Sequence, residues 1–500
     1  MTGRANLPVF IEGYGPVTPW DSAAFPLTEP RAPRAGRTPR RTKTLLAALE
    51  NSGLQNGGTL SFHHHLRDGD GLMVETLKTC ARIGLRDLHI APSSIFPCHA
   101  GLVPLMEQGV VTRITTSYIN GPVADAVRAG KLATPVVLQT HGGRAAAIED
   151  GRLLINVAMI GAPGVDAEGN LTGAVGRSAC GPLGYAMVDA GHAAHVIAVA
   201  DMPDQSLPRI CIPAKRVDQI VKVDSLGDAS KIASGTTARA PGPEGQKIAA
   251  MTARLIAVTE LRKPGFSFQT GAGGTSIAVA KKLAPLMAER GVVGDFACGG
   301  ITAPLVDMQQ AGLFRELRDV QAFDQAAVQS YATDMSHLGI SASDYASPAR
   351  SDAIAHRLGA VVLGAAEVDR EMNINVTTTS DGRIIGGSGG HSDVASGAHL
   401  TIVTTSLRSK TGPKIVRDVL HRTTPGASID AVVTEAGVTL TGQKWSHAAQ
   451  DLEDAGVPFL SPHQLFDRYG DSQPRAWPEG RILAVSEYRD GRVIDVIRAN

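Results

Sequence analysis

The sequence lacks the features that would point to a membrane, secreted or nucleic-acid-binding protein. It has no run of 18 apolar residues and no apolar N-terminal signal segment, so it offers no candidate membrane span or secretory leader. Lys plus Arg and Asp plus Glu number 48 each, so no overall charge attracts nucleic acid or an anionic membrane. The cysteines number five, an odd count, without a Cys-x-x-Cys pair, which indicates a reducing compartment. We therefore predict a cytoplasmic protein with neither a nucleic-acid nor a membrane partner.

The sequence also lacks the common phosphate-binding and hydrolase motifs. No Gly-x4-Gly-Lys-Ser/Thr run is present, and no Gly-x-Gly-x-x-Gly opens a helix with an acidic residue suitably downstream. The polar residues 334–348 include Asp, Ser, His and Tyr, but no Gly-x-Ser-x-Gly elbow accompanies them. These absences argue against nucleotide hydrolysis, dinucleotide redox chemistry and serine hydrolase activity.

The sequence does contain a regular alternation of short β-branched runs and helix-like segments. In the first part of the chain the runs predict buried strands at residues 85–91, 111–117, 135–140, 154–160 and 195–201. Such an alternation is typical of a parallel sheet covered by helices. A run rich in Pro and Gly at residues 240–245 interrupts the pattern, which then restarts.

The length of 500 residues is too great for one ordinary core. We therefore predict an α/β fold with two similar open sheet domains, mainly parallel strands and helices on both faces. The predicted divisions are an N-terminal extension at residues 1–44, a first domain at 45–240 and a second domain at 241–500. Residues 31–43 are rich in Arg and include two prolines, which predicts an extended, solvated arm.

Two glycine-rich turns predict a site built from backbone amides. Residues 386–393 read Gly-Gly-Ser-Gly-Gly-His-Ser-Asp, with four glycines in five positions, and residues 269–274 read Gln-Thr-Gly-Ala-Gly-Gly. Glycines let the backbone approach a ligand closely, and successive free N–H groups attract phosphate, carboxylate or thioester oxygens. The alternative for either turn is a tight loop that binds nothing. We expect the ligand in a cleft between the two domains, at the strand ends.

Two polar clusters in the first domain are candidates for holding an anion. Residues 61–71 contain His63, His64, His65 and Arg67 together with two aspartates. A metal site is the less favoured alternative there, because adjacent histidines in an extended segment alternate faces; an ordinary polar loop is another. The second cluster is residues 141–144, where the Arg144 guanidinium suits a carboxylate, unless it pairs with a nearby glutamate on the surface.

Taken together, these residues resemble the alpha subunit of citrate lyase, a family within the CoA-transferase superfamily. The similarity is collinear from about residue 45 to the C-terminus. The motifs that carry it are Ser-Phe-His-His at 61–64, Val-Val-Thr-Arg at 110–113, His-Gly-Gly-Arg at 141–144, Asn-Val-Ala at 156–158, Ile-Val-Lys-Val-Asp at 220–224, Phe-Ser-Phe-Gln-Thr-Gly at 266–271, Gly-Gly-Ile-Thr at 299–302, Asn-Ile-Asn-Val at 373–376 and the turn at 386–393.

The resemblance implies a transferase that moves a thioester-bearing carrier from acetate to citrate, giving citryl-thioester and acetate. It implies no tightly bound cofactor in this chain, with acetyl-CoA or the CoA-derived prosthetic group of an acyl carrier protein as co-substrate. The implied partners are the acyl carrier (gamma) and citryl-thioester lyase (beta) subunits of citrate lyase, in a homo-oligomeric assembly. No metal site is expected.

The site residues follow from this reading. Citrate is a tricarboxylate and needs cationic and hydrogen-bonding donors, for which the candidates are His63, His64, Arg67, Arg113, His141 and Arg144. The thioester arm needs backbone amides, for which the candidates are Thr270, Gly271, Gly273, Gly274, Gly386, Gly387, Gly389, Gly390, His391 and Asp393.

The resemblance also exposes a missing nucleophile. Many CoA-transferases use a glutamate in a segment that aligns with residues 297–300, and the glutamate position falls on Gly299. Glycine cannot form a glutamyl-thioester, so we expect citrate to attack the thioester directly. The N–H groups of Gly299 and Gly300 are the predicted oxyanion donors. Glu367 and Glu435 are the alternative nucleophiles.

Alternative functions stay open at this point. One is a CoA-transferase for another acid, such as citramalate, acetate or hydroxybutyrate. Another, from a different class, is a metabolite-binding module or a sugar-phosphate isomerase with the same sheet arrangement, which would need a single sugar-phosphate pocket and no thioester tunnel.

Overall fold

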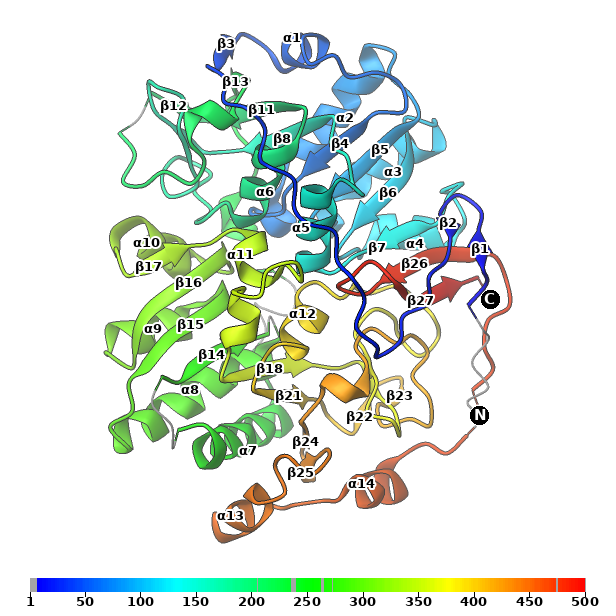
Figure 1. Ribbon diagram of the computed structural model, residues 1–500, viewed down its shortest axis with the longest axis vertical. Helices are drawn as coiled ribbons and strands as arrows, with labels where there is room; N and C mark the ends of the chain where they lie inside the picture. Colours follow the sequence, from blue (N-terminus) through cyan, green and yellow to red (C-terminus); the bar gives the residue numbers. More distant parts are fainter. Residues whose placement is uncertain are drawn as a thin grey trace.

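The computed structural model describes residues 7–204, 206–234, 240–261, 265–271, 273–473 and 475–499. Two large sheets dominate it, one above the other in Figure 1. The first sheet has ten strands, in the order β27 (Val493–Arg498), β26 (Ile482–Glu487), β7 (Val136–Leu138), β6 (Val111–Thr116), β5 (Leu88–Pro92), β4 (Thr59–Phe62), β8 (Val157–Gly161), β11 (His195–Ala200), β13 (Gln219–Lys222) and β3 (Arg40–Thr42).

The second sheet has eight strands and the same kind of layout. Their order is β17 (His337–Gly339), β16 (Phe314–Ala322), β15 (Gly294–Ile301), β14 (Ser267–Thr270), β18 (Ala360–Gly364), β21 (Leu400–Thr404), β24 (Ala431–Thr434) and β25 (Gly437–Leu440). Neighbouring strands are parallel in both sheets, except for one antiparallel pair at an end of each, β26 with β27 and β24 with β25. The α/β fold with mainly parallel open sheets is thus confirmed.

Helices cover both faces of each sheet, as the strand sequences require. Every residue of β8 and β21 is buried, which is expected where a parallel strand has helices above and below it. One face of the first sheet carries α1 (Leu45–Glu50), α2 (Leu72–Arg82), α3 (Leu102–Glu107) and α4 (Pro122–Arg128); the other carries α5 (His141–Asp150) and α6 (Gly184–His192).

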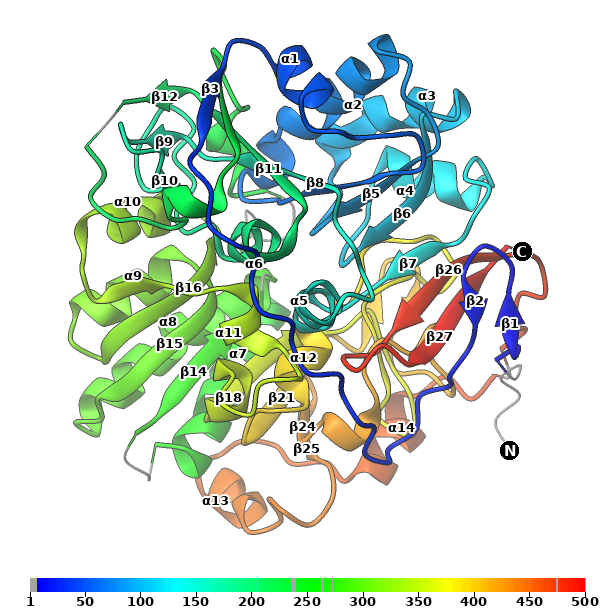
Figure 2. The same cartoon turned by 45° about the horizontal axis from the view of Figure 1, so that its top comes forward.

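The helices α5 and α6 lie between the two sheets (Figure 2). Helix α5 packs against α11 (Ala342–Ala346) and α12 (His391–Ala395) of the second sheet, and α6 packs against β16. The outer face of the second sheet is covered by α7 (Pro243–Thr259), α8 (Gly274–Glu289), α9 (Ala303–Gln310) and α10 (Gln325–Thr333).

Each sheet has a point at which the order of its strands reverses. In the first sheet β5, β6 and β7 follow β4 on one side, whereas β8, β11 and β13 lie on the other. In the second sheet the corresponding change falls between β14 and β18. Open α/β sheets bind ligands outside the carboxyl ends of the strands at such a switch point. The topology therefore marks two places for a site, one after β4 and β8 and one after β14 and β18.

The two ends of the chain are both attached to the first sheet. Strand β26 pairs in parallel with β7, so residues 482–498 extend the first sheet although they come last in the sequence. The hydrophobic side chains of Ile11, Val485 and Val493 pack together, which joins the N-terminal hairpin to the C-terminal one. The domain boundaries stay a prediction. The pattern of short strands in the sequence gave no indication that residues 482–498 would pair with the first sheet.

The N-terminal extension is not a free arm. Strand β3 pairs with β13 at the sheet edge, Arg34 forms an ion pair with Asp218 at 2.6 Å, and the Arg31 guanidinium donates to the Ile148 carbonyl. The Arg34 side chain is only 12% exposed, so the expectation of a solvated arm is wrong for this residue.

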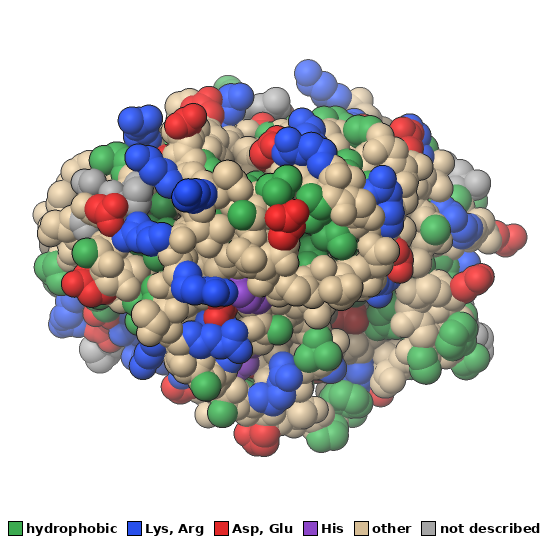
Figure 3. Space-filling view, turned by 90° about the horizontal axis from the view of Figure 1, so that it is seen from above, with side chains coloured by type: hydrophobic (Ala, Val, Ile, Leu, Met, Phe, Trp, Pro, Cys, Tyr) green, Lys and Arg blue, Asp and Glu red, His purple; other side chains and the backbone are tan. Residues whose placement is uncertain are grey.

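Figure 3 shows Lys and Arg side chains crowded over part of the face seen from the side of α1 and β3. No helix in the described part of the chain is long and apolar enough to cross a membrane.

Candidate active site

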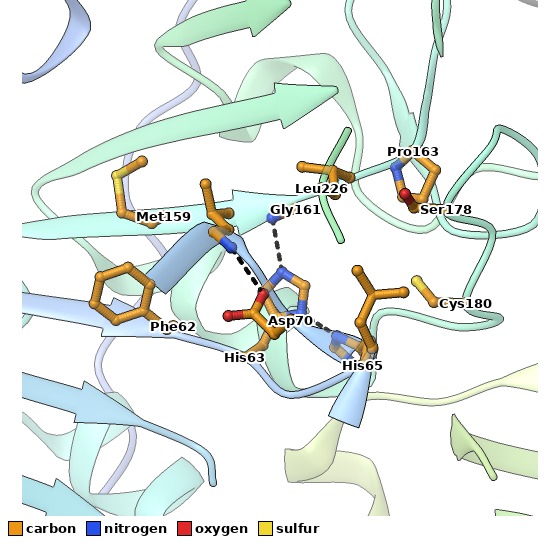
Figure 4. A pocket seen from close by; sticks show the side chains of 12 residues that line it. Phe62, His63, His65, Asp70, Met159, Gly161, Pro163, Ser178, Cys180 and Leu226 are labelled. Carbon is orange, nitrogen blue, oxygen red and sulfur yellow. Dashed lines mark hydrogen bonds between the residues drawn. The ribbon is translucent and has the colours of Figure 1, made fainter. Parts of the chain in front are cut away.

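The histidines that follow β4 lie at the switch point of the first sheet. His63 Nε2 accepts a hydrogen bond from the Gly161 N–H at 2.9 Å, and its Nδ1 forms a hydrogen bond with Nδ1 of His65. Burial lowers the pKa of His63 to about 4, so this imidazole is neutral at neutral pH. The cavity beside His63 and His65 (Figure 4) has a volume of about 10 Å³, which is room for about one water molecule. The first switch point is thus closed in this structure.

His64 turns away from that cavity toward a group of rings between the two sheets. Its ring centroid lies 4.8 Å from that of Tyr185 and 5.6 Å from that of His141. The His64 Nδ1 is 2.6 Å from the Ser93 hydroxyl, and its carbonyl accepts a hydrogen bond from the Gln321 amide of the second sheet. Burial lowers the pKa of His64 far below its usual value and that of His141 to about 3. These histidines therefore offer neutral hydrogen-bonding nitrogens rather than charges.

Arg67 is a buried cation of this region that has no carboxylate partner among the described residues; its guanidinium donates a long hydrogen bond of 3.5 Å to the Ser234 carbonyl. Its guanidinium lies 5.4 Å from the ring centroid of Phe96 and 4.6 Å from that of Phe323, one from each side of the junction. Arg67 is 7% exposed, and its φ of +52° is unusual for a residue with a side chain. Burial lowers its pKa to about 10, so the guanidinium keeps its charge at neutral pH. A buried, unpaired cation costs stability unless a ligand neutralises it.

Among the described residues, eight buried polar atoms without a hydrogen-bond partner lie at the carboxyl ends of strands in the two sheets, and others are spread through the rest of the structure. Native proteins leave few such atoms, so a concentration of them points to a bound ligand or water. The atoms in question are His65 Nε2, Arg67 Nε, Ser117 Oγ, His141 Nδ1, Gln269 Oε1, Thr270 Oγ1, Thr302 Oγ1 and Gln321 Oε1. Within the described ranges, no group of His, Cys, Asp or Glu side chains could hold a metal ion.

Two of the predicted citrate ligands are engaged with protein groups in this structure. Arg113 donates to the carbonyls of Gly57 and Asp87, which precede β4 and β5, so it lies at the amino ends of the strands. Arg144 is 2% exposed and forms two hydrogen bonds of 2.9 and 3.0 Å to the Asp189 carboxylate. Its guanidinium also donates to the Ala91 carbonyl. The partner is thus a buried aspartate, which the local sequence gave no means of finding, and Arg144 joins α5 to α6.

The glycine-rich turn at residues 386–393 is packed against protein instead of enclosing an open space. A Cβ on Gly387 would lie 2.4 Å from the Ser117 carbonyl oxygen, and one on Gly390 would lie 2.8 Å from the Tyr345 hydroxyl. Gly386 is similarly close to the Tyr118 ring, and Gly389 donates to the Ser117 carbonyl. These glycines allow the second sheet's loop to approach the loop after β6, which is the alternative that the sequence left open.

Two polar residues of that turn, His391 and Asp393, form hydrogen bonds within the protein itself. Asp393 is fully buried and accepts hydrogen bonds from the Thr140 hydroxyl at 2.8 Å and the Gly142 N–H at 2.9 Å. It thereby fixes the N-terminus of α5 and the position of His141. His391 has both ring nitrogens engaged, with the Thr424 hydroxyl and the Gly364 carbonyl. Neither side chain points at a free space, so we regard both as positioning residues.

A test of this packing is the variant Gly387→Ala. The added methyl group would collide with the Ser117 backbone, and such overpacking costs about 1–3 kcal/mol. We expect a lower melting temperature, measured by calorimetry, along with reduced activity. Gly191→Ala is the control, since a Cβ at this helical position meets nothing within 4 Å. An unchanged melting temperature for Gly387→Ala would mean that the turn is not held in this way.

The second glycine-rich turn does border open space. Gly273 and Gly274 line a pocket of about 600 Å³ at the second switch point, together with Gly364, Thr404 and Lys414. An adjoining pocket of about 270 Å³ shares Ala240, Pro241 and Gly274 with it and extends to Thr302 and Phe323. Since the Phe323 ring contacts Arg67, the two pockets form a path toward the ring cluster. Gly271 has no free N–H to offer a ligand in this path, because its N–H donates to the Val362 carbonyl at 2.6 Å.

Gly299 and Gly300 lie at an irregularity in β15, just before α9. The pairing of β15 with β16 shifts between them, and Gly299 has a φ of +99°. A Cβ on Gly299 would lie 2.7 Å from the Gln269 amide carbon, and one on Gly300 would lie 2.2 Å from the Phe323 ring. A glutamate side chain at position 299 would therefore require rearrangement of its neighbours, which agrees with the absence of that nucleophile.

Sequence reasoning missed several residues of the site. Tyr185 lies in an apolar helix, Gln321 lies near the end of a strand, and Tyr345, whose hydroxyl accepts from the Gln269 amide at 2.8 Å, lies within the polar segment 334–348. Phe96 and Phe323 flank Arg67 from different sheets. The polar segment that contains Tyr345 stood out in the sequence but suggested no such role, and the other residues belong to no local motif; only the packing of the two sheets brings them together.

Comparison with known proteins gives one consistent result. Residues 40–500 match the family model Citrate lyase, alpha subunit (CitF). The chain is 43% identical over 458 residues to the citrate lyase alpha chain of Escherichia coli (strain K12), covering 90% of this chain and 89% of that one. It is 41% identical over 464 residues to the Klebsiella pneumoniae chain, covering 91% and 90%. A solved Streptococcus mutans structure, described as a citrate lyase alpha subunit in complex with citrate, superimposes with a TM-score of 0.90 at 37% identity, covering 96% of each chain.

Proposed function

Because this chain belongs to the citrate lyase alpha subunit family and is a citrate CoA-transferase, we propose that transfer occurs at the junction of its two sheets. Citrate binds on the side of the first sheet, and the acetyl-thioester arm enters from the second. The observation that supports this placement is the Arg67 guanidinium, which has no carboxylate partner among the described residues and lies beside a path of open pockets that leads toward the junction.

In this proposal Arg67 binds a citrate carboxylate, and His64 and His141 orient it. Charge-assisted hydrogen bonds to a guanidinium contribute about 1.5–3 kcal/mol each, whereas the neutral imidazoles distinguish oxygen positions without adding charge. His63 supports the loop through Gly161. Since the space beside the histidines is closed in this structure, we infer that the sheets or the Arg67 side chain move slightly when citrate enters.

The thioester arm occupies the path of pockets at the second switch point. Gly273 and Gly274 border it, and the Thr270 hydroxyl lacks a partner within the described residues. The arm belongs to acetyl-CoA or to the prosthetic group of an acyl carrier subunit. Its reactive end lies next to Phe323, Gly299 and Gly300, whose N–H groups we propose as donors to the thioester oxyanion.

The proposed chemistry is direct exchange between two bound substrates. A citrate carboxylate oxygen attacks the acetyl carbonyl carbon and expels the thiolate, which gives a mixed anhydride. The thiolate then attacks the citryl carbonyl and expels acetate, so that citryl-thioester and acetate result without net proton transfer. Orientation of bound reactants can supply effective molarities of about 10⁵ M or more.

The carboxylates of Glu367 and Glu435, the two alternative nucleophiles, both accept hydrogen bonds from neighbouring protein groups. Glu367 is held by Arg475 at 2.7 Å and also accepts from Asn375 and the Leu420 N–H. Glu435 accepts from the Leu407 N–H. Breaking these bonds would be necessary before either carboxylate could attack a thioester.

We therefore predict sequential kinetics and no covalent enzyme intermediate. With acetyl-CoA as the sole substrate, the denatured protein should carry neither acetyl nor CoA label in mass spectrometry. Initial rates measured over a grid of both substrates should give intersecting lines. Ping-pong kinetics, or a borohydride-trappable glutamyl-thioester, would overturn the direct route while leaving the transferase activity intact.

The function itself is tested by label transfer with the purified chain. Labelled CoA should move from acetyl-CoA to citrate, and citramalate offered in its place should be a poorer acceptor. Preference for citramalate would shift the assignment to a transferase for that acid.

We further propose cytoplasmic location, homo-oligomerisation and assembly with the acyl carrier and citryl-thioester lyase subunits, which co-purification with these subunits would test.

A further inference from the structure

The larger pocket of the second sheet contains a lysine that the proposed function does not yet use. Lys414 follows the hairpin of β22 (Arg408–Ser409) and β23 (Gly412–Pro413) and lines the pocket of about 600 Å³. Its side chain forms no hydrogen bond or ion pair with any residue of the described part. The surrounding carboxylates are those of Glu435 and Glu367, which are engaged with Leu407 and Arg475, and Glu244 at the exposed rim. Lys414 thus lines the pocket with an ammonium group that has no ion-pair partner among the described residues.

Two helix N-termini open into the same pocket. Both α7 and α8 begin after a glycine, Gly242 and Gly273, and neither has a side-chain cap. A Cβ on Gly242, Gly273 or Gly364 would meet nothing within 4 Å, so the backbone borders free space at all three positions. The uncapped N–H groups and the helix dipoles favour an anion there.

We propose that Lys414 and the N-termini of α7 and α8 bind the phosphate groups of the thioester arm. This assignment rests on the proposed function, since it requires an arm derived from CoA. The geometry gives the arm a direction: its phosphates lie at Lys414, and its pantetheine part follows the adjoining pocket past Gly274 toward Phe323 and Arg67. An uncharged portion suits that second pocket, where Ile277, Ala278 and Pro304 supply apolar walls.

The experiment compares two thioesters that differ in phosphate. In the variant Lys414→Met, the KM for acetyl-CoA should rise about 10- to 100-fold, because one charge-assisted contact is lost. The KM for acetyl-pantetheine, which carries no nucleotide or phosphate, should stay within twofold, as should that for citrate. Lys410→Met is the control, since Lys410 is exposed in the same hairpin and should leave all three constants unchanged.

Titration gives a second, independent readout. Burial lowers the pKa of Lys414 to about 8, so its ammonium is charged below that pH and becomes neutral above it. Affinity for acetyl-CoA, measured by calorimetry without citrate, should weaken as pH rises through 8 in the wild type. In Lys414→Arg, where the charge persists, this weakening should disappear. The acidic groups around Lys414 are Glu435 and Glu367, with Glu244 at the rim of the pocket.

Each outcome separates this inference from the proposed function. Equal damage to acetyl-CoA and acetyl-pantetheine in Lys414→Met would overturn the phosphate assignment while transfer remained established. A selective loss of citrate affinity would place a citrate carboxylate at Lys414 instead. No change in any constant would also overturn the assignment. Failure of the wild-type chain to transfer CoA would contradict the proposed function, whereas calorimetric binding of CoA would still test Lys414.

Discussion

Replacing Arg67 with Gln is expected to raise the KM for citrate by about two orders of magnitude and to leave that for acetyl-CoA nearly unchanged. The guanidinium is buried between Phe96 and Phe323 without a carboxylate partner in the described residues, so the ion pair that its loss removes is the one with the substrate. Steady-state kinetics with each substrate varied in turn measures the effect.

The same variant should fold normally, which separates a ligand-binding role from a structural one. Removing this buried cation breaks no ion pair among the described residues; the ring contacts, about 0.5–2 kcal/mol, and a long hydrogen bond of 3.5 Å to the Ser234 carbonyl are lost. Arg113→Gln is the matched control, because Arg113 lies at the opposite ends of the strands and should leave the citrate KM unchanged. Equal rises in both substrate constants for Arg67→Gln would argue that Arg67 shapes the fold instead.

Replacing Arg144 with Met is expected to have the opposite result, a loss of stability of about 3–5 kcal/mol with little specific effect on citrate binding. The change leaves the fully buried Asp189 carboxylate without its partner, and an uncompensated buried charge carries a penalty of this size. Chemical denaturation of the purified variant measures the loss, and a reduced yield of folded protein should accompany it.

The double variant Arg144→Met with Asp189→Leu provides the control for this explanation. Replacing both members of a buried ion pair by apolar side chains is often neutral, because no charge remains buried. We expect the double variant to recover most of the stability that Arg144→Met loses. If it were as unstable as the single variant, packing rather than the unpaired carboxylate would be the cause. A selective increase in citrate KM for folded Arg144→Met would restore Arg144 as a ligand.

The two arginines show what the sequence could and could not predict about the site. Both follow a strand, and both occur beside glycine or histidine, so the local pattern made them equivalent candidates. Their roles differ because Asp189, which is distant in sequence, approaches only Arg144. The role of a buried charged residue depends on its partner. A contact between α5 and α6 cannot be recognised from the sequence of either helix alone.

The fold was easier to predict from the sequence than the site, because the fold depends on patterns that repeat along the chain. The predicted strand at residues 195–201 agrees with β11 to within one residue, and that at 111–117 agrees with β6 equally well. The strand predicted at 154–160 begins later, at Val157, because Leu154 is 61% exposed. Apolar content alone could not distinguish a surface leucine from the first residue of a buried strand.

The glycine-rich turn at residues 386–393 shows a different limit. Glycines permit close approach of the backbone to any neighbour, whether a ligand or another loop. Here the neighbour of Gly387 is Ser117 of the first sheet, so the motif joins the sheets. The turn at residues 269–274 has similar composition but borders a pocket. At residues 386–393 the backbone does approach a neighbour closely, but that neighbour is protein; at residues 269–274 the approach to a ligand stays a prediction.

The return of β26 to the first sheet also has a consequence for how the chain folds during synthesis. Strand β7 keeps an unpaired edge until residues 482–487 leave the ribosome, long after the rest of the first sheet has been made. An exposed parallel edge is prone to pairing with other chains. The first sheet is therefore incomplete as an independent folding unit, and a fragment ending near residue 240 should aggregate, whereas co-expression with the remainder should rescue it.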